Sequence, residues 1–252
     1  MMDLEEKSSD RFLGRGPHYP WGGLYGGQIV AQALRAAAAT VDAEYAVHSL
    51  HAYFIRKGDA EEPIEFEISR LRDGRSFVTR SVVAIQSSGA ILNMSASFNK
   101  GGAERYRQPN VFPSVPNPEV VKDDSWSPMF SRRYVGESEG RAISWLRIPG
   151  AAADDPVIAA CALAYLSDDL ATDAVRSHKQ HLDGAKTRQW NGISLDHAIW
   201  FHRQFDGSDW QLHDFRCEGL GFPRGLAVGQ VYSPDGTHLA TVAQEVLLRR
   251  AQ

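Results

Sequence analysis

The chain has 252 residues, enough for one large domain or two small ones with an ample core. Its 43% hydrophobic and 23% charged residues are ordinary for a globular protein, and a net charge of -4 argues against nucleic acid, whose binders usually carry a basic stripe. Two cysteines are too few for a disulfide framework or a structural zinc site, and no apolar run approaches the roughly 18 residues of a membrane span.

The first predicted element is a helix that opens at Gly26 and Gly27. Ile29, Ala33 and Ala37 form one row at i, i+4 spacing, so the buried stripe consists largely of small side chains. We expect alanine on this stripe to let a sheet come unusually close to the helix. The two glycines leave the first backbone N–H groups open to a carbonyl or an anion at the positive end of the helix dipole.

Strands and then a long linker follow this helix. Turn residues and hydrophobic patterning predict strands at Val47–Phe54, Ile64–Leu71, Phe77–Gln86 and Ala90–Phe98. From Lys100 to about Trp126 the pattern gives way to glycine, proline, asparagine and charge, over a length unusual inside one compact domain. We therefore divide the chain into residues 1–99, a linker at 100–126 and residues 127–252.

The same plan restarts after the linker. Ala142–Ile148 is predicted to be a strand, and Asp155 with Pro156 makes a good N-cap and first turn for a second helix. The strands that follow are predicted at Ser194–His202, Trp210–Cys217, Gly225–Tyr232 and Leu239–Leu248. An offset of 147 residues places Phe54 on Phe201 and Ala96 on Ala243. The sequence thus predicts an α+β fold of two repeats, each an antiparallel sheet wrapped around a central helix.

Several motifs, in order from about Gly14 to the C-terminus, resemble those of the type II acyl-CoA thioesterases. They are Tyr25-Gly26-Gly27-Gln28, the strand His48–Phe54, Arg72–Phe77, Leu195–Arg203 and the terminal pair Gln244-Glu245. The resemblance implies a double hotdog fold and hydrolysis of fatty acyl-CoA, with acyl-CoA as the small-molecule partner. We expect no cofactor, no bound metal and a homo-oligomer. The absence of a secretory signal and of a peroxisomal tripeptide favours the cytoplasm.

Asp168 is the strongest candidate for chemistry. It lies three residues after Tyr165 and seven after Cys161, and so continues the apolar face of the second helix. A carboxylate there must be paired, or its pKa must rise, and near a helix C-terminus its charge also opposes the dipole. The alternative is that the helix ends earlier and that Asp168 and Asp169 are solvated.

Gln244 is the second candidate, because it shares one face of the last strand with apolar residues only. A buried amide needs hydrogen-bond partners, and a purely structural role would also satisfy it. In the family that this chain resembles, an aspartate, a hydroxyl residue and a glutamine hold the attacking water; the matching positions are Asp168, Ser194 and Gln244. The 147-residue offset puts Val47 and Ser97 at the places of Ser194 and Gln244, so we expect one working site per chain.

Two other patterns are weaker evidence for a catalytic serine or a metal site. Gly136–Gly140 matches the G-x-S-x-G nucleophile elbow, but a strand-like segment follows it instead of a helix, which favours a hairpin turn. The pairs His48/His51 and His178/His181 are spaced too closely for the two-histidine zinc helix.

Three functions remain open at this point. The first is an acyl-CoA thioesterase in which Asp168 takes a proton from water, while Gly26 and Gly27, or the start of the second helix, hold the thioester oxygen. The second is a hotdog dehydratase or hydratase, which usually employs a histidine at the helix; neither predicted helix contains one. The third is a protein that binds acyl thioesters without catalysis.

Overall fold

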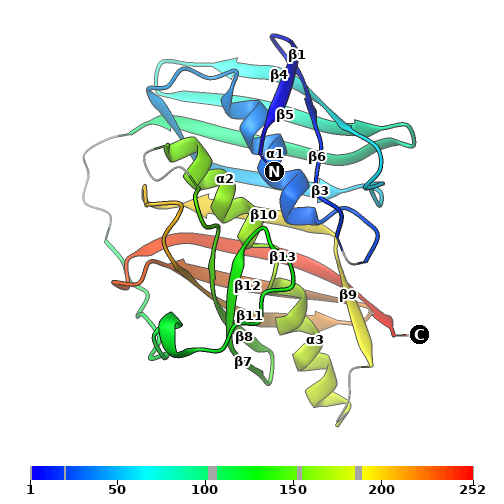
Figure 1. Cartoon of the computed structure of the whole chain (residues 1–252), viewed down its shortest axis with the longest axis vertical. Helices are drawn as coiled ribbons and strands as arrows, with labels where there is room; N and C mark the ends of the chain where they lie inside the picture. The colour runs from blue at the N-terminus through cyan, green and yellow to red at the C-terminus, as the bar shows by residue number, and fades with distance from the viewer. Residues whose placement is uncertain (1, 20, 102–106, 152–154, 185–188, 252) are drawn as a thin grey trace.

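Two successive sets of strands and helices build the molecule, shown in Figure 1 as a computed structural model that describes residues 2–19, 21–101, 107–151, 155–184 and 189–251. The first set is β1 (Leu4–Ser8), β2 (Arg11–Gly14), α1 (Gly26–Ala38), β3 (Tyr45–Phe54), β4 (Ile64–Asp73), β5 (Phe77–Gln86) and β6 (Gly89–Lys100). The second set is β7 (Ser131–Ser138), β8 (Arg141–Arg147), α2 (Pro156–Leu166), α3 (Ala171–Leu182), β9 (Trp190–Ser194), β10 (Asp196–Phe201), β11 (Gln211–Gly221), β12 (Arg224–Tyr232) and β13 (His238–Arg250).

The two sets form one antiparallel sheet with a repeated strand order. From one edge the order is β1-β2-β4-β5-β6-β3, and from the other it is β7-β8-β11-β12-β13-β10, with β9 paired to β13. The halves meet where β3 pairs with β10. His51 lies opposite Ala198, which is 147 residues further along the chain, so a local twofold axis passes through this pair. The predicted fold of two sheet-wrapped helices is confirmed.

Four elements were not predicted from the sequence. They are β1, β2, β7 and α3. The predicted strand at 194–202 is also divided into β9 and β10, because the register against β13 shifts by one residue between Ser194 and Ala198; β9 pairs with β13 alone, whereas β10 pairs with both β13 and β3. This break matters for the site, since Ser194 is the last residue of β9.

Strand pairing corrects the predicted offset in the last strand. Arg80 pairs with Ala96 in the first repeat, and Ala227, 147 residues after Arg80, pairs with Gln244 in the second. The last strands are therefore related by 148 residues, and Ala96 takes the place of Gln244; the prediction that Ser97 does so is wrong. An error of one residue in the offset would exchange the two faces of a strand. Ala96 and Gln244 both lie on the buried face, which agrees with the 148-residue relation.

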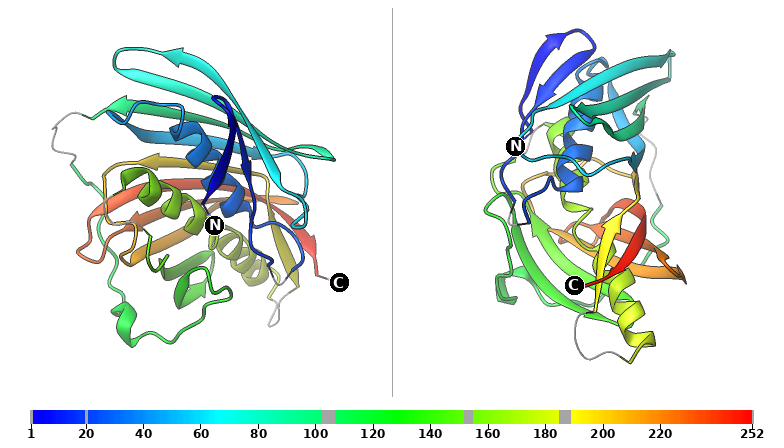
Figure 2. Two further views of the ribbon diagram at one scale, coloured as in Figure 1. Left: turned by 45° about the horizontal axis from the view of Figure 1, so that its top comes forward. Right: turned by 90° about the vertical axis from the view of Figure 1, so that its right-hand side faces the viewer.

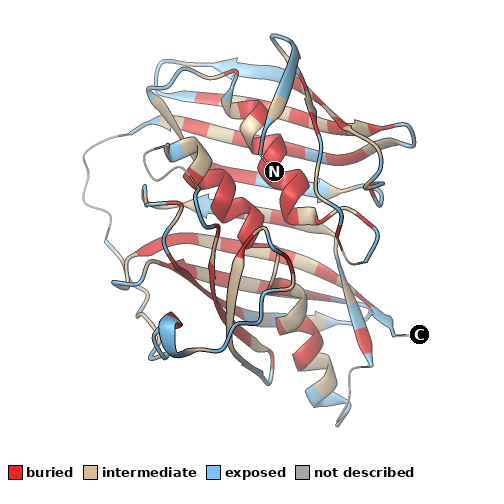
Figure 3. Cartoon of the chain, in the orientation of Figure 1, coloured by how far each residue is buried: buried red, intermediate tan, exposed pale blue. Residues whose placement is uncertain are grey.

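The helices α1 and α2 lie against each other in the hollow of the curved sheet (Figure 2). The alanine-rich stripe of α1, which we expected to allow close packing of a sheet, also allows close packing of α2. Figure 3 shows their facing turns as buried, and the buried alanines are Ala31, Ala33, Ala36, Ala37, Ala159, Ala160, Ala162 and Ala164. In the part of the chain that the structure describes, no helix is long and apolar enough to cross a membrane.

The start of α1 touches the end of α2. A Cβ atom at Gly27 would lie 2.2 Å from the Tyr165 carbonyl oxygen, and one at Gly26 would lie 2.6 Å from an Asp168 carboxylate oxygen. The two glycines thus permit a close crossing of helix ends, in addition to exposing N–H groups.

Residues 107–126 run along the outer surface of the second repeat, at the lower left of Figure 1. Phe112 and Val115 pack on a small apolar cluster formed by Ile143, Trp145, Trp210, Leu212 and Tyr232. Trp145 Nε1 donates to the Pro116 carbonyl at 2.9 Å, and Trp210 Nε1 donates to Glu119 at 3.0 Å. The described residues of this segment therefore cover apolar side chains on the face of the sheet that points away from the helices.

Gly27→Ala should destabilise the fold, because the obstructing atom is a main-chain oxygen that cannot rotate away. We expect the free energy of unfolding to fall by about 1–3 kcal/mol, the usual range for overpacking. Urea denaturation measures this, with Gly101→Ala as control, since a Cβ at Gly101 meets nothing within 4 Å. Equal stability of the two variants would contradict the close crossing.

Candidate active site

Asp168, Ser194 and Gln244 meet although they are distant in sequence. Asp168 lies in the short connection between α2 and α3, Ser194 ends β9, and Gln244 lies in the middle of β13 on the face toward the helices. The second helix does end earlier, at Leu166, yet Asp168 stays only 7% exposed because the start of α1 covers it. The alternative of a solvated aspartate is therefore wrong.

Short hydrogen bonds join the three side chains in a row. Ser194 Oγ donates to Asp168 Oδ1 at 2.9 Å, and Gln244 Nε2 donates to Ser194 Oγ at 2.7 Å. On its other side, Asp168 Oδ2 accepts from the Gly27 backbone N–H at 2.9 Å. The NH₂ group of Gln244 has two N–H donors, so the same amide can act on both Ser194 and the Asp168 carboxylate.

Burial controls the charge of Asp168. Loss of hydration raises the pKa of this carboxyl to about 6, while hydrogen bonds from Ser194, Gln244 and Gly27 favour the charged form and limit the rise. The group is thus ionised at neutral pH and remains a stronger proton acceptor than an exposed aspartate. A carboxylate in this state is suited to general base catalysis.

His197 extends the row and was not predicted to be part of it. Its Nδ1 lies 2.5 Å from Gln244 Oε1, and its Nε2 lies 2.8 Å from Ser167 Oγ. Burial lowers the pKa of His197 to about 4, so the ring is neutral and carries one proton. Because Gln244 Oε1 can only accept, that proton is on Nδ1, and Nε2 accepts from Ser167.

This arrangement fixes the orientation of Gln244. With its oxygen held by His197, the amide must present its NH₂ group to Ser194. The sequence signal for His197 was available, since it alternates with Ile199 on the buried face of β10. The neighbouring Asp196 faces the other way and accepts from the Glu245 N–H, so it is no partner of His197.

The predicted role of the two glycines is only partly visible in the geometry. The Gly27 N–H already bonds to Asp168, which leaves the Gly26 N–H as the other glycine donor at this helix end. The start of α2 lies at the opposite end of the helix pair, and Asp155 caps its Val157 and Ile158 N–H groups. The helix N-terminus that donates a backbone N–H to Asp168 is that of α1, whereas α3 begins three residues further along the chain, at Ala171.

Asp169, next in sequence, is engaged elsewhere. Its carboxylate accepts from Trp126 Nε1 at 2.7 Å and forms an ion pair with Arg132 at 2.9 Å. Arg132 also reaches Asp124 and Asp173. This partly buried ion-pair network anchors the connection that carries Asp168, and Arg132 compensates the charge of Asp169.

Aromatic rings form one wall beside Asp168. The Tyr25 ring stacks edge-on against Tyr165 and Trp126, with centroids 4.9 and 5.3 Å apart. Tyr165 also bonds to Tyr19 through the two hydroxyl groups. The Phe54 ring approaches Gly26 from the seam between the repeats. This wall gives the carboxylate an apolar setting, which is why its pKa rises.

The G-x-S-x-G match is confirmed to be a hairpin. Ser138 ends β7, the turn passes through Glu139 and Gly140, and β8 follows at once. His178 and His181 lie on α3, whereas His48 and His51 lie on β3. Among the described residues, no group of three histidine, cysteine or acidic side chains could hold a metal ion.

Comparison with known proteins gives one consistent result. The sequence model described as the acyl-CoA thioesterase N-terminal domain matches residues 15–99, and the one described as acyl-CoA thioesterase matches residues 121–247. The chain is 32% identical to acyl-CoA thioesterase 2 of Haemophilus influenzae, over 99% of this chain and 96% of that protein.

Solved structures agree with the sequence comparison. A crystal structure of an acyl-CoA thioesterase II from Mycobacterium marinum has a TM-score of 0.85 at 34% identity, covering 100% of this chain and 96% of that one. A protein with a hot dog fold from Alicyclobacillus acidocaldarius has a TM-score of 0.83, covering 100% and 97% of the two chains; at 20% identity it shows the fold alone.

His197→Asn should lower the free energy of unfolding near pH 7 by about 1–3 kcal/mol, the cost of leaving buried polar groups unpaired. The loss should shrink as the pH falls from 6.5 toward 4, because the unfolded chain then takes up a proton on His197 that the folded protein rejects, which destabilises only the histidine form. Urea denaturation at several pH values tests this, with the exposed His51→Asn as control. A pH-independent difference would contradict a neutral, buried His197.

Proposed function

The chain belongs to the acyl-CoA thioesterase II family and is an acyl-CoA thioesterase, and we propose that Asp168, Ser194 and Gln244 activate the water that hydrolyses its substrate. One observation carries this proposal above the others. It is the unbroken row of hydrogen bonds from Gln244 through Ser194 to a buried carboxylate whose pKa is about 6.

In the proposed reaction, a water molecule lies beside Asp168, within reach of the Ser194 hydroxyl and the NH₂ group of Gln244. The water oxygen attacks the thioester carbonyl carbon, and Asp168 takes the proton. When the tetrahedral intermediate collapses, the carbon–sulfur bond breaks and the thiolate of CoA leaves, taking up that proton. The products are a free acid and CoA, and no group on the protein changes.

The start of α1 supplies the proposed site for the thioester oxygen. The Gly26 N–H lies at the positive end of the helix dipole, beside the carboxylate that activates water. Gly27 serves differently in this scheme, because its N–H holds Asp168 in place. Negative charge that develops on the oxygen would then be stabilised by α1, while the base belongs to the second repeat.

Two alternatives are less well supported. A dehydratase needs a base at the substrate carbon, and His197 is unsuited because both of its ring nitrogens are hydrogen-bonded in the core. A protein that only binds thioesters has no use for a carboxylate kept buried against its desolvation cost. The geometry thus favours hydrolysis.

Asp168→Asn should reduce kcat by about 100- to 10,000-fold, the usual contribution of a general base, without unfolding the protein. In the unaltered enzyme, kcat/KM should fall about tenfold per pH unit below pH 6, because protonated Asp168 cannot accept a proton. A thiol assay for released CoA gives both results. Asp206→Asn, an exposed change, is the control. Full turnover by a folded Asp168→Asn variant would disprove the mechanism.

Gln244→Ala should lower kcat by about 10- to 1,000-fold, as expected for losing one oriented donor. Ser194→Thr keeps the hydroxyl and should retain substantial activity, whereas Ser194→Ala should not. Steady-state kinetics with thermal unfolding of each variant separates catalytic from structural loss. Equal activity of the threonine and alanine variants would show that the hydroxyl has no part in the reaction.

A further inference from the structure

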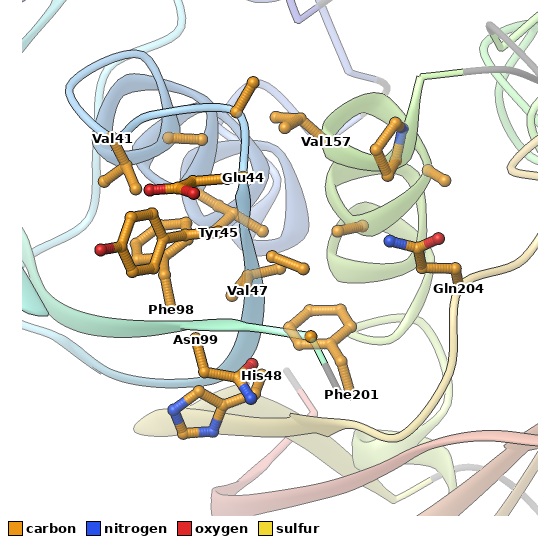
Figure 4. Close-up of a pocket in the computed structure, with 18 of the residues that line it drawn as sticks. Val41, Glu44, Tyr45, Val47, His48, Phe98, Asn99, Val157, Phe201 and Gln204 are labelled. Carbon is orange, nitrogen blue, oxygen red and sulfur yellow. The ribbon is translucent and has the colours of Figure 1, made fainter. Parts of the chain in front are cut away.

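A large pocket lies at the opposite end of the helix pair from Asp168. Its volume is about 860 Å³, within the range of small-molecule sites in proteins. The end of α1, the start of α2, β3 and the end of β10 enclose it (Figure 4). Neither the proposed reaction nor the family similarity gives this pocket a role.

The local twofold axis relates this pocket to the candidate active site. At Asp168, the start of α1 meets the end of α2; in the pocket, the start of α2 meets the end of α1. Val47 takes the place of Ser194, because Val47 pairs with Phe98 as Ser194 pairs with Val246. When the helices are aligned from their first residues, Gly26 and Pro156, Asp168 falls on Ala38.

Every hydrolytic group is replaced by an apolar one at this second position. Ala38 and Val47 line the pocket, and Ala96 takes the place of Gln244 next to them. Asp155 accepts from the first N–H groups of α2, so this helix end is closed to a thioester oxygen. The pocket therefore cannot activate water by the proposed route.

A buried arginine lies beside the position that corresponds to Gln244. Arg80 stands where the second repeat has Ala227, beside the position of Gln244. Its guanidinium donates to Thr40, just past the end of α1, and pairs with Asp73. Arg80 thus fills the space next to Ala96, while the volume between the two helices and β3 stays open.

The lining of the open volume consists of apolar side chains, here called the floor, and of polar and charged side chains, here called the rim. Leu34, Ala38, Val47, Phe98, Ala160 and Phe201 form the floor. The rim includes Asp42, Glu44, His48, Asn99, Asp155, Arg203 and Gln204; in Figure 4, His48 and Asn99 lie together, whereas Gln204 lies beside α2. Such a cavity suits a flexible hydrocarbon chain whose polar end remains near solvent.

We infer that this pocket binds a fatty acyl chain without hydrolysing it. The choice of ligand rests on the proposed function, since acyl-CoA and its free acid are the molecules present at the other site. Either one could supply the chain, as unreacted thioester or as product. The first repeat would then have lost its chemistry and kept its binding site.

Binding stoichiometry tests this inference. Isothermal titration would use S-decyl-CoA, a thioether that cannot be hydrolysed, and decanoate in a separate series. We expect two ligands per chain for at least one of these probes. Binding of decanoate alone at the second site would identify the acid as the occupant, and binding of S-decyl-CoA would identify the thioester; both outcomes support the inference.

Val157→Trp should weaken the second binding event at least tenfold, because Val157 points into the pocket from the partly exposed first turn of α2. Val47→Asp, which places a charge in the floor without filling it, should have the same effect. Val111→Trp makes the same change at an exposed position. It is the control and should leave the affinity of the second binding event unaltered.

Hydrolysis separates failure of this inference from failure of the proposed function. Val157→Trp should keep normal turnover, whereas Asp168→Asn should lose turnover and keep both binding events. One ligand per chain for both probes, unaffected by Val157→Trp and Val47→Asp, would overturn the inference even if hydrolysis proceeds as proposed. If the proposed hydrolytic mechanism proved wrong, the binding stoichiometry would still test this inference, because neither probe has to be hydrolysed.

Discussion

The contact between the start of α1 and the end of α2 is the constraint on which the candidate site depends. A carboxylate after the end of α2 is unfavourable for that helix, because the dipole of α2 presents negative charge there. The start of α1 reverses this, since it brings its own positive end and the Gly27 N–H to Asp168. The crossing is possible only because Gly26 and Gly27 have no side chains. The proposed base and the helix end that holds it thus come from different repeats.

This contact also explains the charge state that the chemistry needs. Full burial alone would keep Asp168 protonated, and full exposure would make it a weak base. Three donors from α1, β9 and β13 compensate part of the desolvation cost, so the pKa settles near neutrality. His197 adds the orientation of Gln244, without which the amide could turn its oxygen toward Ser194.

Much of this could be predicted from the sequence, and the failures have physical reasons. The two-repeat fold followed from helix and strand periodicity, and Gln244 was recognisable as an amide on an apolar strand face. The register of β13 was not predicted correctly. Chance identities such as Ala96 with Ala243 favoured an offset of 147 residues, and this error of one residue exchanges the two faces of the strand. The burial of Asp168 beyond the end of α2 depends on α1, which is more than a hundred residues away. Helix α3 was missed because its mixed charges form ion pairs with β7 that local patterning does not reveal.

The repeated strand order, with one chain carrying both halves, has an evolutionary consequence. In a symmetric dimer of single repeats, any substitution appears twice, so changing a glutamine to alanine would remove both active sites at once. Once the halves are fused, each position is inherited separately, and one half can change while the other is held by selection. The contrast between Ala38, Val47 and Ala96 in one half and Asp168, Ser194 and Gln244 in the other is a divergence that a symmetric dimer of identical repeats could not carry.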